Sequence, residues 1–245
     1  MRISGGGARG IPLISISGRE LRPATGSLRE ALFSSLGPWI QDKTFLDLFA
    51  GTGSYGLEAL SRGARAGVFV EKNRRTAEIL HQNLQAVLQS LGIFSNPSEL
   101  RCGDVRHFKS LRSSSNLCEL RCIDVQRFKS LRSSSDLCEL RCGDVRRFKN
   151  LGISSNPCEI LCGDARYFRS EQSFDLLFLD PPFALSRRQA PNLLAQVFPL
   201  LQSGGRLAFE LPSDLVPPSH DALSLLRRLG QTTGHGPSMA VYERK

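Results

Sequence analysis

The stretch that decides the fold is Asp47-Leu-Phe-Ala-Gly51-Thr-Gly53-Ser-Tyr-Gly56. It ends a near-continuous apolar run that begins at Thr44, and its glycines let the backbone approach a ligand closely where a helix begins. A second apolar strand is expected over 67–71, and it ends on Glu71, 20 residues after Gly51. A strand, a glycine-rich turn, a helix and a further strand predict an α/β, doubly wound, mostly parallel Rossmann-like sheet.

The rest of the chain continues this alternation of strands and helices. Further strands are expected over 174–180 and 206–211, a terminal hairpin within 225–242, and a glycine-rich hairpin or arm over 2–12. Helices are expected over 27–36, around 57–60, over 74–91 and over 190–197, the first opened by the capping box Ser27-Leu-Arg-Glu30. In such a sheet, ligands bind beyond the carboxyl ends of the strands.

Composition narrows the class of protein. The chain has 245 residues, and 32 Lys and Arg against 23 Asp and Glu give a net charge of +9. An apolar content of 40% argues against a disordered chain, and no apolar run is long enough to cross a bilayer. With no apolar signal-peptide core after Met1, we expect a cytoplasmic protein without a membrane partner. The positive charge favours a polyanionic partner such as RNA.

An internal repeat of 20 residues occupies the third quarter of the chain. Its copies begin at Glu99, Glu119, Glu139 and Glu159, and each predicts a strand, a Gly-Asp or Ile-Asp turn and a helix. The last copy, with the apolar run Ile160-Leu-Cys162, is expected to fill a core strand, although the first copy competes for that place. The spare copies could stack, extend the sheet or stay partly disordered.

We therefore expect one domain, 1–245, in four parts. These are an N-terminal arm and helix (1–40), a cofactor-binding half (41–100), a repeat insertion (101–160) and a catalytic half (161–245). All seven cysteines fall in the repeat, and neither they nor the four histidines have the spacing of a zinc site. We interpret them as small core residues and expect no metal.

The first chemical signal is Asp47, a carboxylate inside an apolar strand just before the glycine turn. A negative charge there opposes the pyrophosphate of a nicotinamide dinucleotide and suits the cationic amino and sulfonium groups of S-adenosylmethionine. Glu71 is placed to bind ribose hydroxyls.

The second signal is Asp180-Pro181-Pro182-Phe183 at the end of an apolar strand. The prolines fix the backbone and cannot donate hydrogen bonds, so carbonyls at this corner can accept from a ligand. If Asp180 and a carbonyl near Pro181 accept the two N–H bonds of an exocyclic base amine, its lone pair turns toward a methyl donor. Phe183 is placed to stack on the base.

With these motifs the chain resembles the bacterial 16S rRNA (guanine-N2) methyltransferase D family. The residues that carry the resemblance are Arg2-Ile-Ser-Gly-Gly, Leu21-Arg-Pro, Arg29-Glu-Ala-Leu-Phe, Phe45-Leu-Asp-Leu-Phe-Ala-Gly-Thr-Gly, Gly56-Leu-Glu-Ala-Leu-Ser-Arg-Gly-Ala, Val70-Glu-Lys-Asn, Gly163-Asp-Ala and Phe178-Leu-Asp-Pro-Pro-Phe. The 60-residue tandem expansion of the 20-residue segment departs from the family, as does the segment 22–27.

The resemblance implies 16S rRNA (guanine(966)-N2)-methyltransferase activity on the small ribosomal subunit or an assembly intermediate. It implies S-adenosylmethionine bound by Asp47, Gly51, Gly53, Glu71, Asp164 and Ala165, and a guanine held by Asp180, Pro181, Pro182 and Phe183. Arg2, Arg9, Arg22 and Arg29 are candidates for phosphate contacts. A DNA or protein amino-methyltransferase, a nicotinamide oxidoreductase and a catalytically silent RNA-binding relative remain alternatives, and nothing requires more than a monomer.

Overall fold

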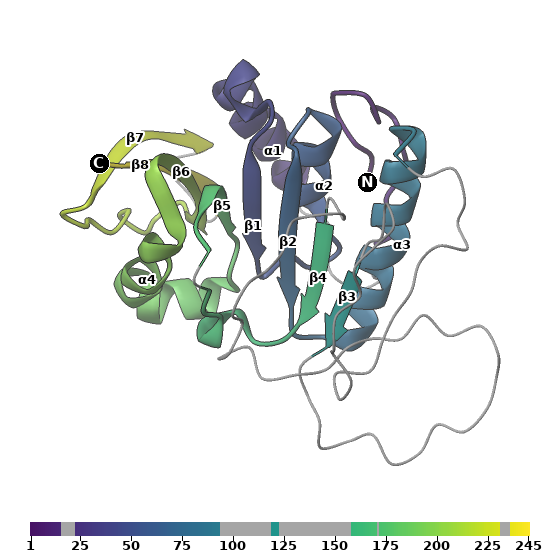
Figure 1. Ribbon diagram of the computed structural model, residues 1–245. Coiled ribbons are helices and arrows are strands. Elements are labelled where there is room, and N and C mark those ends of the chain that lie inside the picture. The colour runs from purple at the N-terminus through teal and green to yellow at the C-terminus, as the bar shows by residue number, and fades with distance from the viewer. Residues whose placement is uncertain (16–22, 94–118, 123–157, 171, 231–235) are drawn as a thin grey trace, which may run out of the picture.

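The computed structural model describes residues 1–15, 23–93, 119–122, 158–170, 172–230 and 236–245. Its strands form one sheet in the order β3-β4-β2-β1-β5-β6-β8-β7 (Figure 1). The strands are β1 (Thr44–Leu48), β2 (Ala66–Glu71), β3 (Glu119–Cys122), β4 (Cys158–Cys162), β5 (Phe174–Leu179), β6 (Leu201–Pro212), β7 (Leu223–Gly230) and β8 (Pro237–Arg244). The strands from β3 to β6 pair in parallel, and β8 pairs antiparallel with β6 and β7. The expected doubly wound sheet and terminal hairpin are confirmed.

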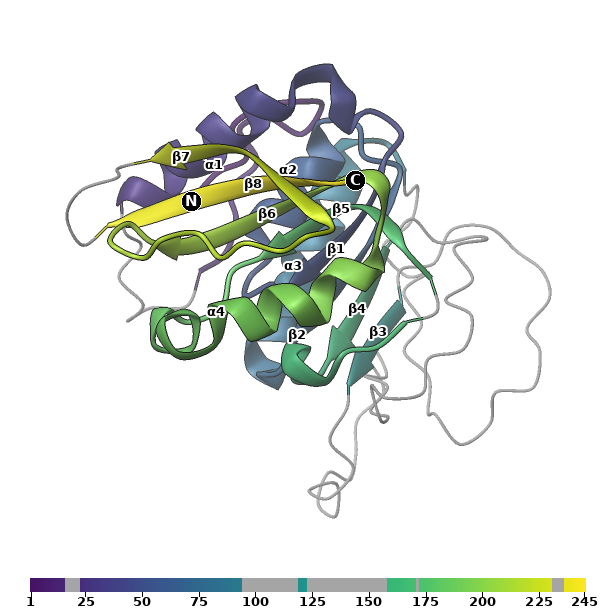
Figure 2. The same cartoon turned by 90° about the vertical axis from the view of Figure 1, so that its left-hand side faces the viewer.

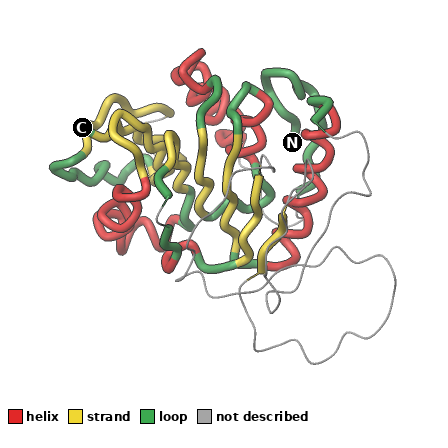
Figure 3. The backbone as a smooth tube through the Cα atoms, viewed as in Figure 1, coloured by secondary structure: helices red, strands yellow, loops and turns green. Residues whose placement is uncertain are grey.

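Helices cover both faces of this sheet (Figures 2 and 3). The α-helices are α1 (Pro23–Leu36), α2 (Ser54–Ser61), α3 (Arg74–Ser90) and α4 (Phe183–Val197), and short 3-10 turns occupy Gly37–Ile40, Ala165–Tyr167 and Phe198–Leu200. Apolar residues of α1, α2 and α3 pack in one core cluster, while those of α4 pack in a second cluster on the opposite face. Among the described residues, no helix is long and apolar enough to cross a membrane.

Two helices begin earlier than the sequence predicts. Helix α1 starts at Pro23 rather than at the Ser27 capping box, because proline suits the first turn of a helix, where its missing N–H costs nothing. Helix α4 starts at Phe183 rather than Ala190, and it bends at Gln189, whose φ is −138°. Pro191 lies two residues further on, and a proline inside a helix disturbs the preceding turn. The prediction 190–197 therefore matches only the part beyond the bend.

The repeat supplies two neighbouring strands. The last copy forms β4 between β2 and β3, which confirms the expected core strand. The second copy forms β3 at the edge of the sheet, paired in parallel with Glu119 opposite Glu159 and Cys122 opposite Cys162. One spare copy thus extends the sheet, while most of the other spare residues lie outside the described part of the chain. Cys158 and Cys162 are buried and not in a disulfide, as expected of small core residues.

Candidate functional site

The carboxyl ends of four adjacent strands are joined by backbone hydrogen bonds. The N–H of Gly163, after β4, donates to the carbonyl of Glu71 at 2.8 Å, and that of Ala50, after β1, donates to Val70 at 3.0 Å. The N–H of Asp180, after β5, lies 3.4 Å from the carbonyl of Leu48. The chain leaves β1 toward β2 on one side and meets β5 on the other, so this edge holds the topological switch point where ligands bind.

Asp47 lies within β1, between Phe69 of β2 and Phe178 of β5. Its side chain is 1% exposed, and Oδ2 accepts a 2.9 Å hydrogen bond from the N–H of Gly56 in α2. Burial raises the pKa of this carboxyl to about 7, against the opposing effect of the Gly56 hydrogen bond and with a smaller contribution from the charge of Glu71. A cation placed beside Asp47 would favour its ionised form.

The glycine turn has the backbone that its sequence indicates. Gly51 and Gly53 have backbone φ angles of 59° and 92°, which residues other than glycine rarely adopt. A Cβ on Gly53 would lie 2.3 Å from Cδ1 of Leu80, so helix α3 packs directly against the turn. Phe49, which precedes the turn, also has a positive φ of 62°, a strained conformation that the sequence did not reveal.

Glu71 ends β2 and holds two turns by its carboxylate. Oε2 accepts from the N–H of Gly51 at 2.9 Å and Oε1 from the N–H of Asn73 at 2.8 Å. The side chain that was predicted to bind ribose hydroxyls therefore also fixes the glycine turn. Asp47 and Glu71 place two carboxyl groups at the turn, which fits a cationic, hydroxyl-bearing ligand better than a pyrophosphate.

Asp164 and Ala165 follow β4 on the same side of the sheet. Ala165 is 5% exposed, and Asp164 begins the short 3-10 turn by accepting the N–H of Arg166 at 3.0 Å. The Arg166 guanidinium also pairs with both carboxylate oxygens of Asp164, which holds the pKa of Asp164 below its usual range. A ligand amine approaching Asp164 would share it with Arg166.

The Asp180-Pro181-Pro182-Phe183 motif leads from β5 directly into α4. The carbonyl of Pro182 accepts from the N–H groups of Leu185 and Ser186, at 2.8 and 3.1 Å. Pro181 is buried and Phe183 is half-buried. Because the Pro182 carbonyl already accepts in the first turn of α4, the predicted base acceptor near Pro181 is best taken as the carbonyl of Pro181 itself.

Sequence reasoning missed a buried acid beside this motif. Glu210, near the end of β6, is 3% exposed and accepts a 2.6 Å hydrogen bond from the hydroxyl of Tyr55 in α2. The Tyr55 ring stacks on Phe178, two residues before Asp180. Burial and the charges of Glu210 and Asp180 raise the pKa of Tyr55 well above its ordinary value, so Tyr55 remains a donor. A carboxylate inside an apolar strand was the signal used for Asp47, and it also marks Glu210.

The four candidate phosphate contacts differ in position. Arg2 and Arg9 are exposed on the N-terminal hairpin, whose two sides meet at a bridge between Arg2 and Pro12. Arg22 lies outside the described residues. The prediction that Arg29 contacts phosphate is wrong. Arg29 is only 4% exposed, and its guanidinium is bound inside the protein.

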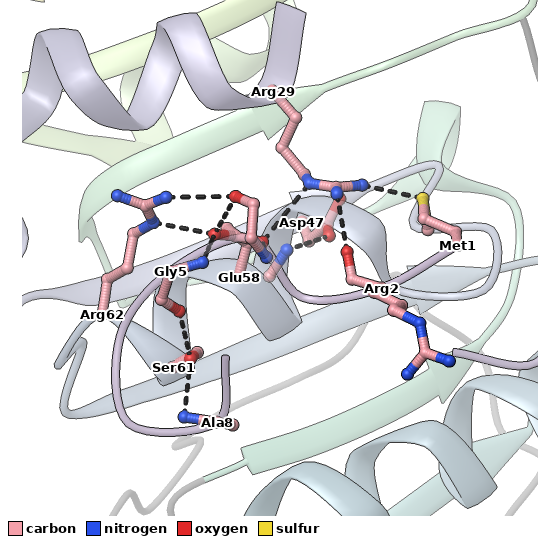
Figure 4. Close-up of polar contacts among 11 residues, drawn as sticks. Met1, Arg2, Gly5, Ala8, Arg29, Asp47, Glu58, Ser61 and Arg62 are labelled. Atoms are coloured by element: carbon pink, nitrogen blue, oxygen red, sulfur yellow. Dashed lines mark hydrogen bonds and ion pairs between the residues drawn. The ribbon is translucent and has the colours of Figure 1, made fainter. Parts of the chain in front are cut away.

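The group that holds Arg29 is Glu58 of α2, which is itself fully buried (Figure 4). Nε of Arg29 lies 3.4 Å from Oε2 of Glu58, and Nη2 donates to the carbonyl of Arg2 at 2.9 Å. Glu58 also accepts from the N–H groups of Ser4 and Gly5, both at 2.9 Å. Arg29 and Glu58 therefore anchor the N-terminal hairpin.

Known structures resemble this architecture along nearly the whole chain. The structure of yhhF from Escherichia coli matches with a TM-score of 0.61 and 22% identity, over 100% of this chain and 98% of the other. The N-methyltransferase NodS from Bradyrhizobium japonicum matches with a TM-score of 0.52 and 11% identity, over 92% and 98%. The fold is the α/β Rossmann-like fold of methyltransferases.

Sequence comparison narrows the relationship. Residues 1–118 match the family described as conserved hypothetical protein 95. The chain is 45% identical to ribosomal RNA small subunit methyltransferase D of Escherichia coli K12 over 84 residues, which are 34% of this chain and 42% of that protein. The Haemophilus influenzae protein of the same name is 41% identical over 87 residues, 36% and 45%. The predicted resemblance to the small-subunit rRNA methyltransferase D proteins is confirmed. The matches span less than half the length of these curated relatives.

Proposed function

We propose that this protein transfers a methyl group from S-adenosylmethionine to N2 of a guanine in 16S rRNA of the small ribosomal subunit. The observation that carries the proposal is the buried Asp47 carboxylate at the switch point, with its pKa raised to about 7. A permanent cation beside such a group stabilises its ionised carboxylate, and the sulfonium supplies that cation. The names of the curated relatives support ribosomal RNA as the substrate class.

In this proposal three strand ends bind the cofactor. S-adenosylmethionine supplies an activated methyl group on its sulfonium. Asp47 faces the cationic part, Glu71 shares its carboxylate between the Gly51 N–H and the ribose hydroxyls, and Asp164 with Ala165 lies at the adenine. The glycine turn lets the backbone approach the ligand without a side chain in between.

Residues 180–183 perform the acceptor chemistry. The carboxylate of Asp180 and the carbonyl of Pro181 accept the two N–H bonds of the guanine amine, which directs its lone pair toward the methyl group. With S-adenosylmethionine bound, its sulfonium would supply the methyl group and leave as a thioether, and Asp180 would be placed to accept the amine proton that is released. Phe183 stacks on a base that has left its helix. Positioning and exclusion of water provide the acceleration.

The test is methyl transfer from labelled S-adenosylmethionine to small subunits that lack the modification, beside protein-free rRNA and DNA. We expect label in rRNA guanine N2, and loss of that label in Asp180→Ala. Asp175→Asn is the matched control, since Asp175 lies at the other end of β5, where it accepts from Thr44. Label in DNA or protein would support the other amino-methyltransferases, and RNA binding without label would support the silent relative.

A further inference from the structure

The N-terminal arm touches the glycine turn through one side chain, Asn83 of α3. Oδ1 of Asn83 accepts the N–H of Ile14 at 2.7 Å. Its Nδ2 donates at 3.0 Å to the carbonyl of Ile14 and at 3.0 Å to that of Thr52. Asn83 is 1% exposed, so its amide is shielded from water although Ile14 itself is 50% exposed.

The two ends of this bridge have different roles. Thr52 lies between Gly51 and Gly53, both at positive φ, in the turn proposed to hold the cofactor. Ile14 comes just after the N-terminal hairpin. Helix α2 holds the other end of that hairpin. We propose that Asn83 is a positioning residue of the cofactor site, and that docking of the arm fixes the turn in its ligand-binding form. The inference rests on the proposed cofactor.

The physical reason lies in the amide group. An asparagine amide can rotate by half a turn, which exchanges its donor and acceptor ends. Ile14 presents one N–H and one carbonyl, and together they select the orientation in which Nδ2 also faces Thr52. In the opposite orientation Oδ1 would face the carbonyl of Thr52, and the two oxygens would repel each other. The arm therefore determines which end of the amide meets the turn.

The chain provides a matched control in Ser61 of α2. Its buried hydroxyl also bridges two backbone groups of the arm, accepting from Ala8 N–H at 3.0 Å and donating to Gly5 carbonyl at 2.6 Å. Both partners of this hydroxyl belong to the arm, and neither lies in the turn 51–53. Ser61→Ala thus loosens the arm and leaves the contact with the turn in place, whereas Asn83→Ala removes both.

The experiment is titration calorimetry of S-adenosylmethionine with the full chain and its variants, with thermal melts to verify folding. We expect Asn83→Ala to raise Kd about tenfold, the loss of roughly one net hydrogen bond, while Ser61→Ala stays within about twofold. Asn83→Asp keeps the acceptor for the Ile14 N–H but turns an oxygen toward the carbonyls of Ile14 and Thr52, so its Kd should rise at least as much. In turnover assays KM for the cofactor should rise more than kcat falls.

Three outcomes separate the ideas. An unchanged Kd in folded Asn83→Ala or Asn83→Asp would overturn this inference and leave the proposed function intact. An equal rise in Ser61→Ala would overturn the role of Asn83, because general loosening of the arm would then suffice. A wild-type chain that binds no S-adenosylmethionine would refute the proposed function, and this inference with it.

Discussion

The hydroxyl of Tyr55 donates to Oε2 of Glu210 at 2.6 Å, which joins the first turn of α2 to the end of β6. The same tyrosine stacks on Phe178 with 5.6 Å between ring centroids and 19° between ring planes. Because Phe178 precedes Asp180 by two residues, this pair braces the strand that carries the proposed acceptor residue. One tyrosine thus connects helix α2 to strands β5 and β6.

We expect Tyr55→Phe to lower the free energy of unfolding by about 1–3 kcal/mol. The ring still stacks on Phe178, but buried Glu210 loses the 2.6 Å hydrogen bond from the Tyr55 hydroxyl. Urea unfolding of Tyr55→Phe, Glu210→Gln and the double variant measures the coupling. Additive losses would show that the bond contributes nothing.

Two glycines of the turn should respond differently to alanine. Both would place alanine at positive φ, which costs about 1–2 kcal/mol. At Gly53 the new Cβ also meets Cδ1 of Leu80 at 2.3 Å and of Leu57 at 2.8 Å, whereas at Gly51 the nearest atom is Phe49 O at 4.0 Å. Gly53→Ala should therefore be the less stable variant in thermal unfolding, and equal losses would contradict the close packing of α2 and α3 around Gly53.

The sequence predicted the central architecture because its signals are local. An apolar run ending at Asp47, the glycine spacing after it and the apolar run before Asp180 each identify a strand end without knowledge of the rest of the chain. Parallel strands then bring those ends to one edge of the sheet, and the structure confirms this arrangement.

Other features depend on contacts distant in sequence. Arg29 is an ordinary basic residue in the sequence, and its burial follows from Glu58, 29 residues away. Copies of the repeat are nearly identical, so their places depend on single differences. Leu161 lies in β4, which pairs with β2 on one side and with β3 on the other. Arg121, at the equivalent position of its copy, lies in the edge strand β3. The Asn83 bridge could not be predicted because asparagine in a helix carries no signal of its partners.

The anchor of the N-terminal hairpin should be sensitive to the charge of Glu58. Glu58→Gln would leave Arg29 buried beside a neutral amide, and breaking a buried ion pair costs about 3–5 kcal/mol. The matched control is Glu78→Gln, which removes an ion pair with Arg74 in which the Glu78 side chain is 45% exposed. Exposed pairs contribute about 0–1 kcal/mol. Chemical denaturation compares the two variants, and similar losses would refute the anchor.

Asp47 should make both stability and cofactor binding depend on pH. Its pKa is about 7 in the folded chain against 3.8 for the ordinary carboxyl, so between these values the folded state holds a proton that the unfolded state has released. The free energy of unfolding should therefore fall as pH rises through this window, and level off above it. Asp47→Asn should flatten the profile and stabilise the chain at about pH 8, and urea unfolding across the range measures this.

A bound sulfonium reverses the preference, because it favours ionised Asp47. Binding near neutral pH should release a proton, and affinity for S-adenosylmethionine should increase as pH rises through about 7, the pKa of Asp47. Calorimetry in two buffers of different ionisation enthalpy counts that proton. In Asp47→Asn binding should be weaker, and both the proton release and the pH slope should disappear. An unchanged slope in this variant would assign the titration to another group and remove Asp47 from the cation's environment.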